Sequence, residues 1–338
     1  MKLLVVACAT LLQAASCCTN LLVTPGASAE GTSTISYAAD TGALFGMLGH
    51  YPRMNETVRE TYDWDSGTYL GEIPGFGKET YNVIGNTNEF GLTIGETTFG
   101  GNSTLSGGPG VLSYGSVIWI TLQRAKTARE AITVMDSLMQ TYGYTSDGES
   151  FSIADPSEVW IMEVVGKGPK IKGTVWVAKR VPDGYIAAHA NQARIRAPLA
   201  SDPDHCRYSH DVVDFAKSLG LYSGAVEDFS FSDTYDPVGF TGARVAEARV
   251  WEMFRQVSAD PSFGHEYEPY IMGRNLSHRM PLWIKPRAPL SLNQTFWLMR
   301  SGYQGSALDM QDTADVGSGP FDAAMRVRHQ GPFPCRRS

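Results

Sequence analysis

The residues with the clearest potential for chemistry lie near the start of the chain. The stretch "SCCTNLL" at residues 16 to 22 contains two adjacent cysteines, Cys17 and Cys18. A cysteine that begins a mature chain carries its own base, because the thiolate attacks a carbonyl and the α-amino group accepts the thiol proton. The reference pKa values, about 7.7–8.0 for the amine and about 8.5 for the thiol, make this proton transfer nearly balanced at neutral pH. Such a site requires no separate histidine.

The segment before the cysteines has the pattern of a signal peptide. Lys2 supplies a positive charge, "LLVVACATLL" an apolar core and "QAAS" the small residues that precede a cleavage site. Size rules allow cleavage before Cys17 or before Cys18. Triplets for N-glycosylation follow at Asn55, Asn102, Asn275 and Asn293. We therefore expect a secreted glycoprotein in an extracellular or lysosome-like compartment.

Composition excludes several classes of function. A net charge of −7 without clustered Lys or Arg argues against nucleic-acid binding. No segment after the signal approaches the roughly 20 apolar residues of a membrane-spanning helix. The histidines lack HExxH spacing and the cysteines lack CxxC spacing, so no metal or cofactor is predicted. Beyond the doublet, Cys206 and Cys335 are able to pair but are too few for a disulfide scaffold. The oligomeric state is not indicated.

Hydrophobic patterning predicts an α+β fold. Short runs rich in apolar residues, bounded by turn residues, predict strands at 91 to 98, 116 to 123, 150 to 154, 158 to 165, 173 to 181 and 184 to 192. The "DPSE" at 155 to 158 predicts a tight hairpin turn. Helical spacing predicts helices at 127 to 141, 209 to 219 and about 242 to 257. Hairpins with helices segregated around them are typical of layered α+β domains.

Several blocks together resemble a known family. "CTNLLVTPGAS", "YAAD", "NTNEFGLTIGETT", "FSIADPSEVWIMEVVGKG", "YIAAHANQARI" and "ARVWEMF" occur in the order found in the dipeptidase and secernin family of cysteine N-terminal-nucleophile (Ntn) hydrolases. The resemblance implies a four-layer αββα sandwich over residues 18 to 325, after removal of residues 1 to 17 and before an unpatterned tail at 326 to 338. Family members usually continue further, so we expect a chain shortened at its C-terminus.

The resemblance also assigns roles to residues. It implies that Cys18 is the nucleophile, that Asp40 orients its amine and thiol, and that Asn88 and Asn191 stabilise the oxyanion. Arg249 matches an arginine placed near the active site.

Four further residues bear on this assignment. Arg244 competes with Arg249 for the arginine position, and Tyr37 stands where amidase relatives carry an arginine. His189 is interpreted as a structural histidine. Glu96, weighed as a possible acid for glycoside hydrolysis, is interpreted as a residue on a strand face.

The resulting hypothesis is a cysteine dipeptidase that hydrolyses the amide bond of dipeptides or small peptides through a thioester on Cys18. Two alternatives stay open. One is an amidase that acts on non-peptide acyl amides. The other is a shortened, non-catalytic secreted glycoprotein that uses its surface for binding.

Overall fold

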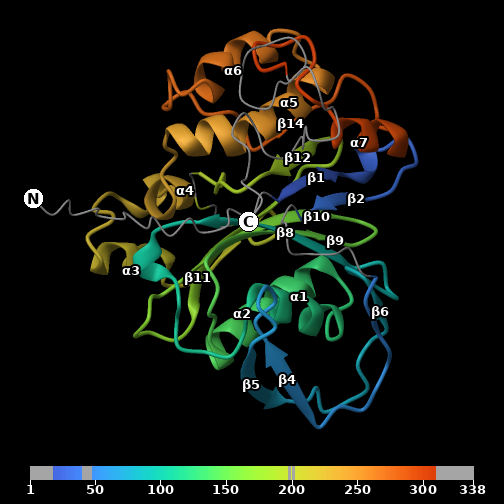
Figure 1. The fold of residues 1–338 in the computed structure, drawn as a ribbon, viewed down its shortest axis with the longest axis vertical. Helices are drawn as coiled ribbons and strands as arrows, with labels where there is room; N and C mark the ends of the chain where they lie inside the picture. The colour runs from blue at the N-terminus through green and yellow to red at the C-terminus, as the bar shows by residue number, and fades with distance from the viewer. Residues whose placement is uncertain (1–17, 40–47, 197–198, 200–201, 310–338) are drawn as a thin grey trace, which may run out of the picture.

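Two antiparallel sheets face each other at the centre of the computed structural model, which describes residues 18–39, 48–196, 199 and 202–309 (Figure 1). The smaller sheet has the order β14-β12-β1-β2. Its strands are β1 (Thr19–Val23), β2 (Thr34–Ala38), β12 (Ile186–His189) and β14 (Trp283–Ile284).

The larger sheet has the order β13-β11-β10-β9-β8-β7-β6-β3. Its strands are β3 (His50–Tyr51), β6 (Val83–Ile84), β7 (Thr87–Asn88), β8 (Thr93–Gly100), β9 (Gly148–Ala154), β10 (Val159–Gly166), β11 (Thr174–Arg180) and β13 (Cys206–Tyr208). A separate hairpin pairs β4 (Val58–Tyr62) with β5 (Tyr69–Pro74).

Helices cover the outer faces of both sheets. In Figure 1, α1 (Tyr114–Leu122) and α2 (Ala128–Tyr142) lie against the larger sheet, and α5 (Ala248–Val257) and α6 (Phe263–Ile271) lie over the smaller one. The remaining helices are α3 (Val212–Ser218), α4 (Phe231–Tyr235), α7 (Leu292–Leu298), a π-helix at Gly242–Glu247, and 3₁₀ turns at Pro25–Ala27, Ser103–Leu105 and Val226–Asp228. The predicted α+β class is confirmed.

Side-chain alternation along β1 explains why the two sheets stack. Successive side chains of a strand point to opposite faces. Leu21 packs with Trp251 of α5, whereas Leu22 packs between the sheets with Val159. Both leucines are fully buried, and each such side chain contributes about 1.5–3 kcal/mol. Burial on both faces fixes β1 firmly, and with it the residue at its start.

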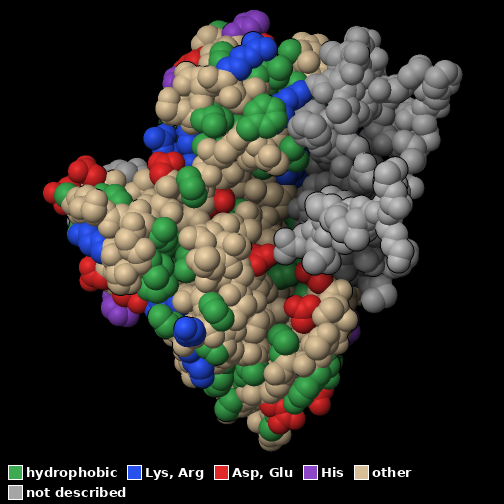
Figure 2. Space-filling view, turned by 60° about the vertical axis from the view of Figure 1, so that its left-hand side comes forward, with side chains coloured by type: hydrophobic (Ala, Val, Ile, Leu, Met, Phe, Trp, Pro, Cys, Tyr) green, Lys and Arg blue, Asp and Glu red, His purple; other side chains and the backbone are tan. Residues whose placement is uncertain are grey.

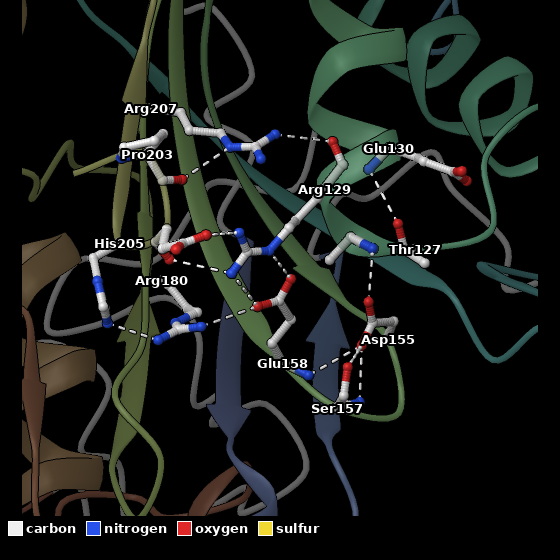
Figure 3. A network of polar contacts seen from close by, with 12 residues as sticks. Thr127, Arg129, Glu130, Asp155, Ser157, Glu158, Arg180, Pro203, His205 and Arg207 are labelled. Carbon is white, nitrogen blue, oxygen red and sulfur yellow. Dashed lines mark hydrogen bonds and ion pairs between the residues drawn. The ribbon is translucent and has the colours of Figure 1, made fainter. Parts of the chain in front are cut away.

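The predicted hairpin turn at 155 to 158 forms and also begins helix α2. The Asp155 carboxylate accepts hydrogen bonds from the backbone N–H groups of Ser157 (2.8 Å) and Ala128 (2.9 Å) (Figure 3). Arg129 of α2 then pairs with Glu158 at 2.7 Å. The turn therefore joins the β9–β10 hairpin to the helix layer, a structural role that occupies Asp155.

One sequence expectation about secondary structure is wrong, and another is confirmed with a difference in helix type. Residues 116 to 123 form helix α1, not a strand, because the Ser113 side chain caps Tyr114–Leu122 and the helix is buried on nearly all sides. The expected helix at 242 to 257 begins as a π-helix and becomes α-helical at Ala248.

Two further observations concern membrane-spanning helices and surface charge. None of the described helices combines the length and apolar character needed to cross a membrane. On the face shown in Figure 2, the Lys and Arg side chains of the described residues are scattered among Asp and Glu and form no continuous basic area.

Candidate active site

Cys18 lies directly before β1 and is almost completely buried. The next strand positions are paired on both sides, with Asn20 opposite Tyr37 of β2 and opposite His189 of β12. Cys18 is therefore held between the end of β2 and the end of β12. Because these neighbours are far away in sequence, the position of the thiol depends on the tertiary fold.

Arg249 ties the backbone of Cys18 to the loop after β12. Its Nη1 donates to the carbonyl oxygen of Cys18 (2.6 Å) and to Thr19 Oγ1 (2.9 Å). Its Nη2 donates to the carbonyl oxygen of Ala190 (2.9 Å) and to Asn191 Oδ1 (2.7 Å).

The guanidinium group is thus fully engaged. Nε donates to the carbonyl oxygen of Val245 at 2.9 Å, so these contacts use all the N–H groups that an arginine has. A substrate carboxylate that accepts from Arg249 must share or replace one of these contacts. The contacts to Cys18 and Asn191 also favour Arg249 over Arg244 as the arginine of the site.

Two unusual backbone features surround this arginine. A π-helix ends two residues before it, at Glu247, and such segments occur frequently at functional sites. Asn191 has a φ of 63°, in the left-handed region that asparagine tolerates better than most residues.

The Asn191 side chain is suited to bind an oxyanion. Its Oδ1 accepts from Arg249 and its Nδ2 donates to the carbonyl oxygen of Thr98. Among the described residues Nδ2 has this one acceptor, so its second hydrogen is available to an oxyanion.

A cavity of about 430 Å³ opens beside these residues. Asn191 and Arg249 line it together with Phe99, Phe240 and Asp236. Burial raises the pKa of Asp236 to about 7. A larger cavity of about 690 Å³ lies between the β4–β5 hairpin and α1 and is lined by none of the site residues predicted from the sequence.

The sulfur of Cys18 faces an acidic side chain. Cys18 Sγ lies 3.9 Å from Glu96 Oε1, and the Tyr37 hydroxyl donates to the same oxygen. Glu96 is 1% exposed, so the sequence expectation of an ordinary strand-face residue is incomplete. The described residues contain no group of three or more His, Cys, Asp or Glu side chains arranged to hold a metal ion.

Asn88 lies away from the thiol and has a different role from the one expected. Its Nδ2 donates to the carbonyl oxygens of Leu122 and Ala125, both at 2.8 Å. Its Oδ1 accepts from the backbone N–H groups of Phe90 and Leu92. Both amide hydrogens are therefore used to join the turn after β7 to the end of α1. In this arrangement Asn88 has no side-chain donor left for an oxyanion.

We expect Asn88→Ala to lower stability and to leave kcat of the folded enzyme nearly unchanged. The substitution leaves buried backbone groups without partners, which predicts a loss of about 3 kcal/mol in the free energy of unfolding. Urea denaturation and steady-state kinetics on the same preparation measure the two effects. A variant that is stable but has a kcat lowered by about 10² or more supports the oxyanion role instead.

His189 is a structural histidine, as the sequence suggested. It is fully buried, with Nδ1 2.7 Å from Thr97 Oγ1 and Nε2 2.7 Å from Ser152 Oγ. Burial, with a smaller effect of the Arg194 charge, lowers the pKa of His189 to about 3. The imidazole therefore stays neutral and joins both sheets.

Because buried His189 excludes a proton in the folded state, we expect the protein to lose stability on acidification. Below pH 6.5 the unfolded chain binds a proton at residue 189 that the folded chain excludes until about pH 3. Between pH 6.5 and 5 the expected contribution is a loss of about 2 kcal/mol. Urea unfolding at pH 7 and pH 5 should show a smaller pH effect in His189→Gln than in the wild type. The exposed His210→Gln serves as the control, and an equal pH effect in all three proteins contradicts the assignment.

Of the residues expected at the site, the structure brings together Cys18, Asn191 and Arg249, and it places Asn88 elsewhere. Asp40 lies outside the described residues. The sequence did not assign a place beside the thiol to Tyr37 or Glu96. A signal for Glu96 was present, since it is a carboxylate in the segment "GLTIGETT", which the sequence predicts to be a strand.

Comparisons with known proteins identify the family of this chain. The family model described as peptidase family C69 matches residues 49–320, which is most of the chain but begins after Cys18. The chain belongs to peptidase family C69.

Curated relatives carry the same kind of name. A "Probable dipeptidase" of Salmonella dublin is 25% identical over 313 residues, covering 86% of this chain and 68% of the relative. A "Probable dipeptidase" of Latilactobacillus sakei is 24% identical and matches over 87% of this chain and 62% of its own length. A "Dipeptidase" of Bifidobacterium longum is 26% identical over 213 residues, which is 37% of its length. The chain thus spans about two thirds, or less, of the length of these relatives.

Proposed function

We propose that this protein is a cysteine dipeptidase of the Ntn type, with Cys18 as its first mature residue. The observation that carries the proposal is the clamp that joins the backbone of Cys18 to Asn191 through Arg249. It sets a thiol, an amide donor and a neighbouring cavity at one end of the smaller sheet. The stacked sheets with helices on both sides support the proposed αββα sandwich.

The reaction follows from the residues available. The α-amino group of Cys18 accepts the thiol proton while Sγ attacks the carbonyl carbon of the peptide bond. Asn191 donates to the oxyanion that forms. The amine of the second residue then leaves with the proton, and a thioester remains on Cys18. Water, deprotonated by the same amine, hydrolyses the thioester and restores the thiol.

We also propose that the chain enters the secretory pathway and that cleavage before Cys18 exposes the amine. The signal-like segment and the glycosylation triplets support this. Asp40, which the family resemblance places beside the amine, keeps its proposed orienting role.

The experiment compares two chains that differ by one residue. One begins at Cys18 and the other at Cys17. Only the first should hydrolyse dipeptides, because an amide nitrogen at residue 18 cannot accept the thiol proton. Mass spectrometry after rapid acid quenching should detect an acyl group on Cys18. Equal activity of both chains would overturn the mechanism, and inactivity of both towards dipeptides would overturn the function.

A further inference from the structure

Two buried glutamates lie side by side next to the thiol. Glu96 is on β8 and Glu149 is on β9, where Glu149 pairs directly with Thr98. Thr98 Oγ1 donates to both carboxylate oxygens of Glu149, at 2.9 and 3.1 Å. Glu96 lies nearer the reaction centre, since its Oε1 is the oxygen that faces Cys18 Sγ and the Tyr37 hydroxyl.

The pair carries charge that the described residues do not neutralise locally. Burial raises the pKa of Glu96, and burial together with the charge of Glu96 raises the pKa of Glu149. Two buried carboxyl groups in side-chain contact resist carrying two negative charges, which favours a proton between them. Glu96 Oε2 is buried and faces no hydrogen-bond donor among the described residues other than such a proton.

The acidic character continues from this pair towards the surface. Tyr114, the first residue of α1, donates its hydroxyl to the exposed Asp65 at 2.9 Å. The negative charges of Glu96, Asp65 and Glu149 all act on Tyr114, which places it among the three carboxyl groups.

The distances suit a cationic group of the substrate. Attack requires the substrate carbonyl carbon at roughly 3–3.5 Å from Sγ. The α-nitrogen of the same substrate residue is two bonds, or about 2.5 Å, from that carbon. With Glu96 Oε1 at 3.9 Å from Sγ, the α-nitrogen can lie within hydrogen-bond distance of Glu96.

We propose that Glu96 and Glu149 form the subsite that binds the free α-ammonium group of the substrate. This inference rests on the proposed function and narrows it to peptides with an unblocked N-terminus. The ammonium group donates to Glu96, and its positive charge compensates the negative charge of the acidic pair. An N-acylated substrate brings a neutral group to the same place and leaves the buried carboxylates without a cation, which is unfavourable.

The test compares alanyl-alanine with N-acetyl-alanyl-alanine on the chain that begins at Cys18. The wild type should prefer the free dipeptide. Glu96→Gln should lower kcat/KM for the free dipeptide by about 100-fold, and Glu149→Gln by about 10-fold because it lies behind Glu96, with little loss for the acetylated one. Both substitutions keep the side-chain shape, and glutamine resembles the protonated member of the pair.

A matched control is Glu163→Gln, since Glu163 is equally buried but accepts from the backbone N–H groups of Arg194 and Ile195. It should leave the ratio between the two substrates unchanged. If Glu96→Gln and Glu149→Gln slow both substrates equally, the pair serves the protein's own amine or its folding, and the proposal is overturned.

Binding to a Cys18→Ala chain separates this proposal from the proposed function. Calorimetric titration with the two dipeptides needs no turnover. The Cys18→Ala chain should bind the free dipeptide more tightly than the acetylated one, and this preference should disappear when Glu96→Gln is added to the same chain. That result supports the subsite even if the wild type proves inactive. Equal binding of both dipeptides overturns it even if the wild type is active.

Discussion

Cys18→Ala is expected to reduce kcat/KM for dipeptide hydrolysis by about 10⁴-fold or more, because no other group can form the covalent intermediate. The variant should fold. The side chain that is removed is small, and the backbone contacts of Cys18 with Arg249 do not involve the sulfur. Circular dichroism and urea unfolding check the fold, and initial rates with dipeptides check the activity.

Cys206→Ala provides the matched control. Cys206 is the other buried cysteine among the described residues, and it lies in β13 at the opposite edge of the larger sheet from β3. Its removal should leave kcat/KM unchanged, and the thiol reagent iodoacetamide should still inactivate the variant. If Cys18→Ala keeps the wild-type rate while Cys206→Ala loses it, the nucleophile has been assigned to the wrong cysteine.

Local chemistry explains which parts of the site were predictable. A candidate nucleophile could be proposed from the sequence, because a cysteine that carries its own amine is a complete unit within one residue. Three strands, at 150 to 154, 158 to 165 and 173 to 181, were also predictable, since apolar runs with a clear turn between them fit few other secondary structures. Helix α1 could not be predicted from the sequence, because its Val, Ile, Trp and Thr residues have a high strand propensity. Its buried position between the sheet and the β4–β5 hairpin overrides this propensity.

The acidic pair depends on contacts that no local pattern encodes. β7 pairs with β8 only at Thr93, so beyond this point β8 has no neighbouring strand on that side among the described residues. Tyr37 and Cys18 approach Glu96 there from the other sheet. Asn88 illustrates the opposite case, because "NEFGL" fits an oxyanion donor and a turn residue equally well. Only its hydrogen-bond partners distinguish the two.

Arg249→Met should affect both stability and catalysis. The guanidinium group donates to the carbonyl oxygens of Cys18, Ala190 and Val245, and the substitution removes these hydrogen bonds from a largely buried site. At about 1–3 kcal/mol for each buried group, a loss of about 3–5 kcal/mol in the free energy of unfolding is expected. In the fraction that folds, kcat/KM should fall by about 10²-fold, because Asn191 and Cys18 lose their common anchor.

Arg249→Lys distinguishes a positioning role from direct binding of a substrate carboxylate. A lysine keeps the charge but reaches fewer of the acceptors, so positioning predicts a fall mainly in kcat, with KM nearly unchanged and part of the stability restored. Carboxylate binding predicts a rise in KM for dipeptides that dipeptide amides, which lack the carboxylate, do not show. The exposed Arg300→Met is the control and should alter neither quantity. Stability equal to that of the wild type in Arg249→Met would contradict the clamp, because it would mean that the buried carbonyl oxygens of Cys18 and Ala190 do not depend on this side chain.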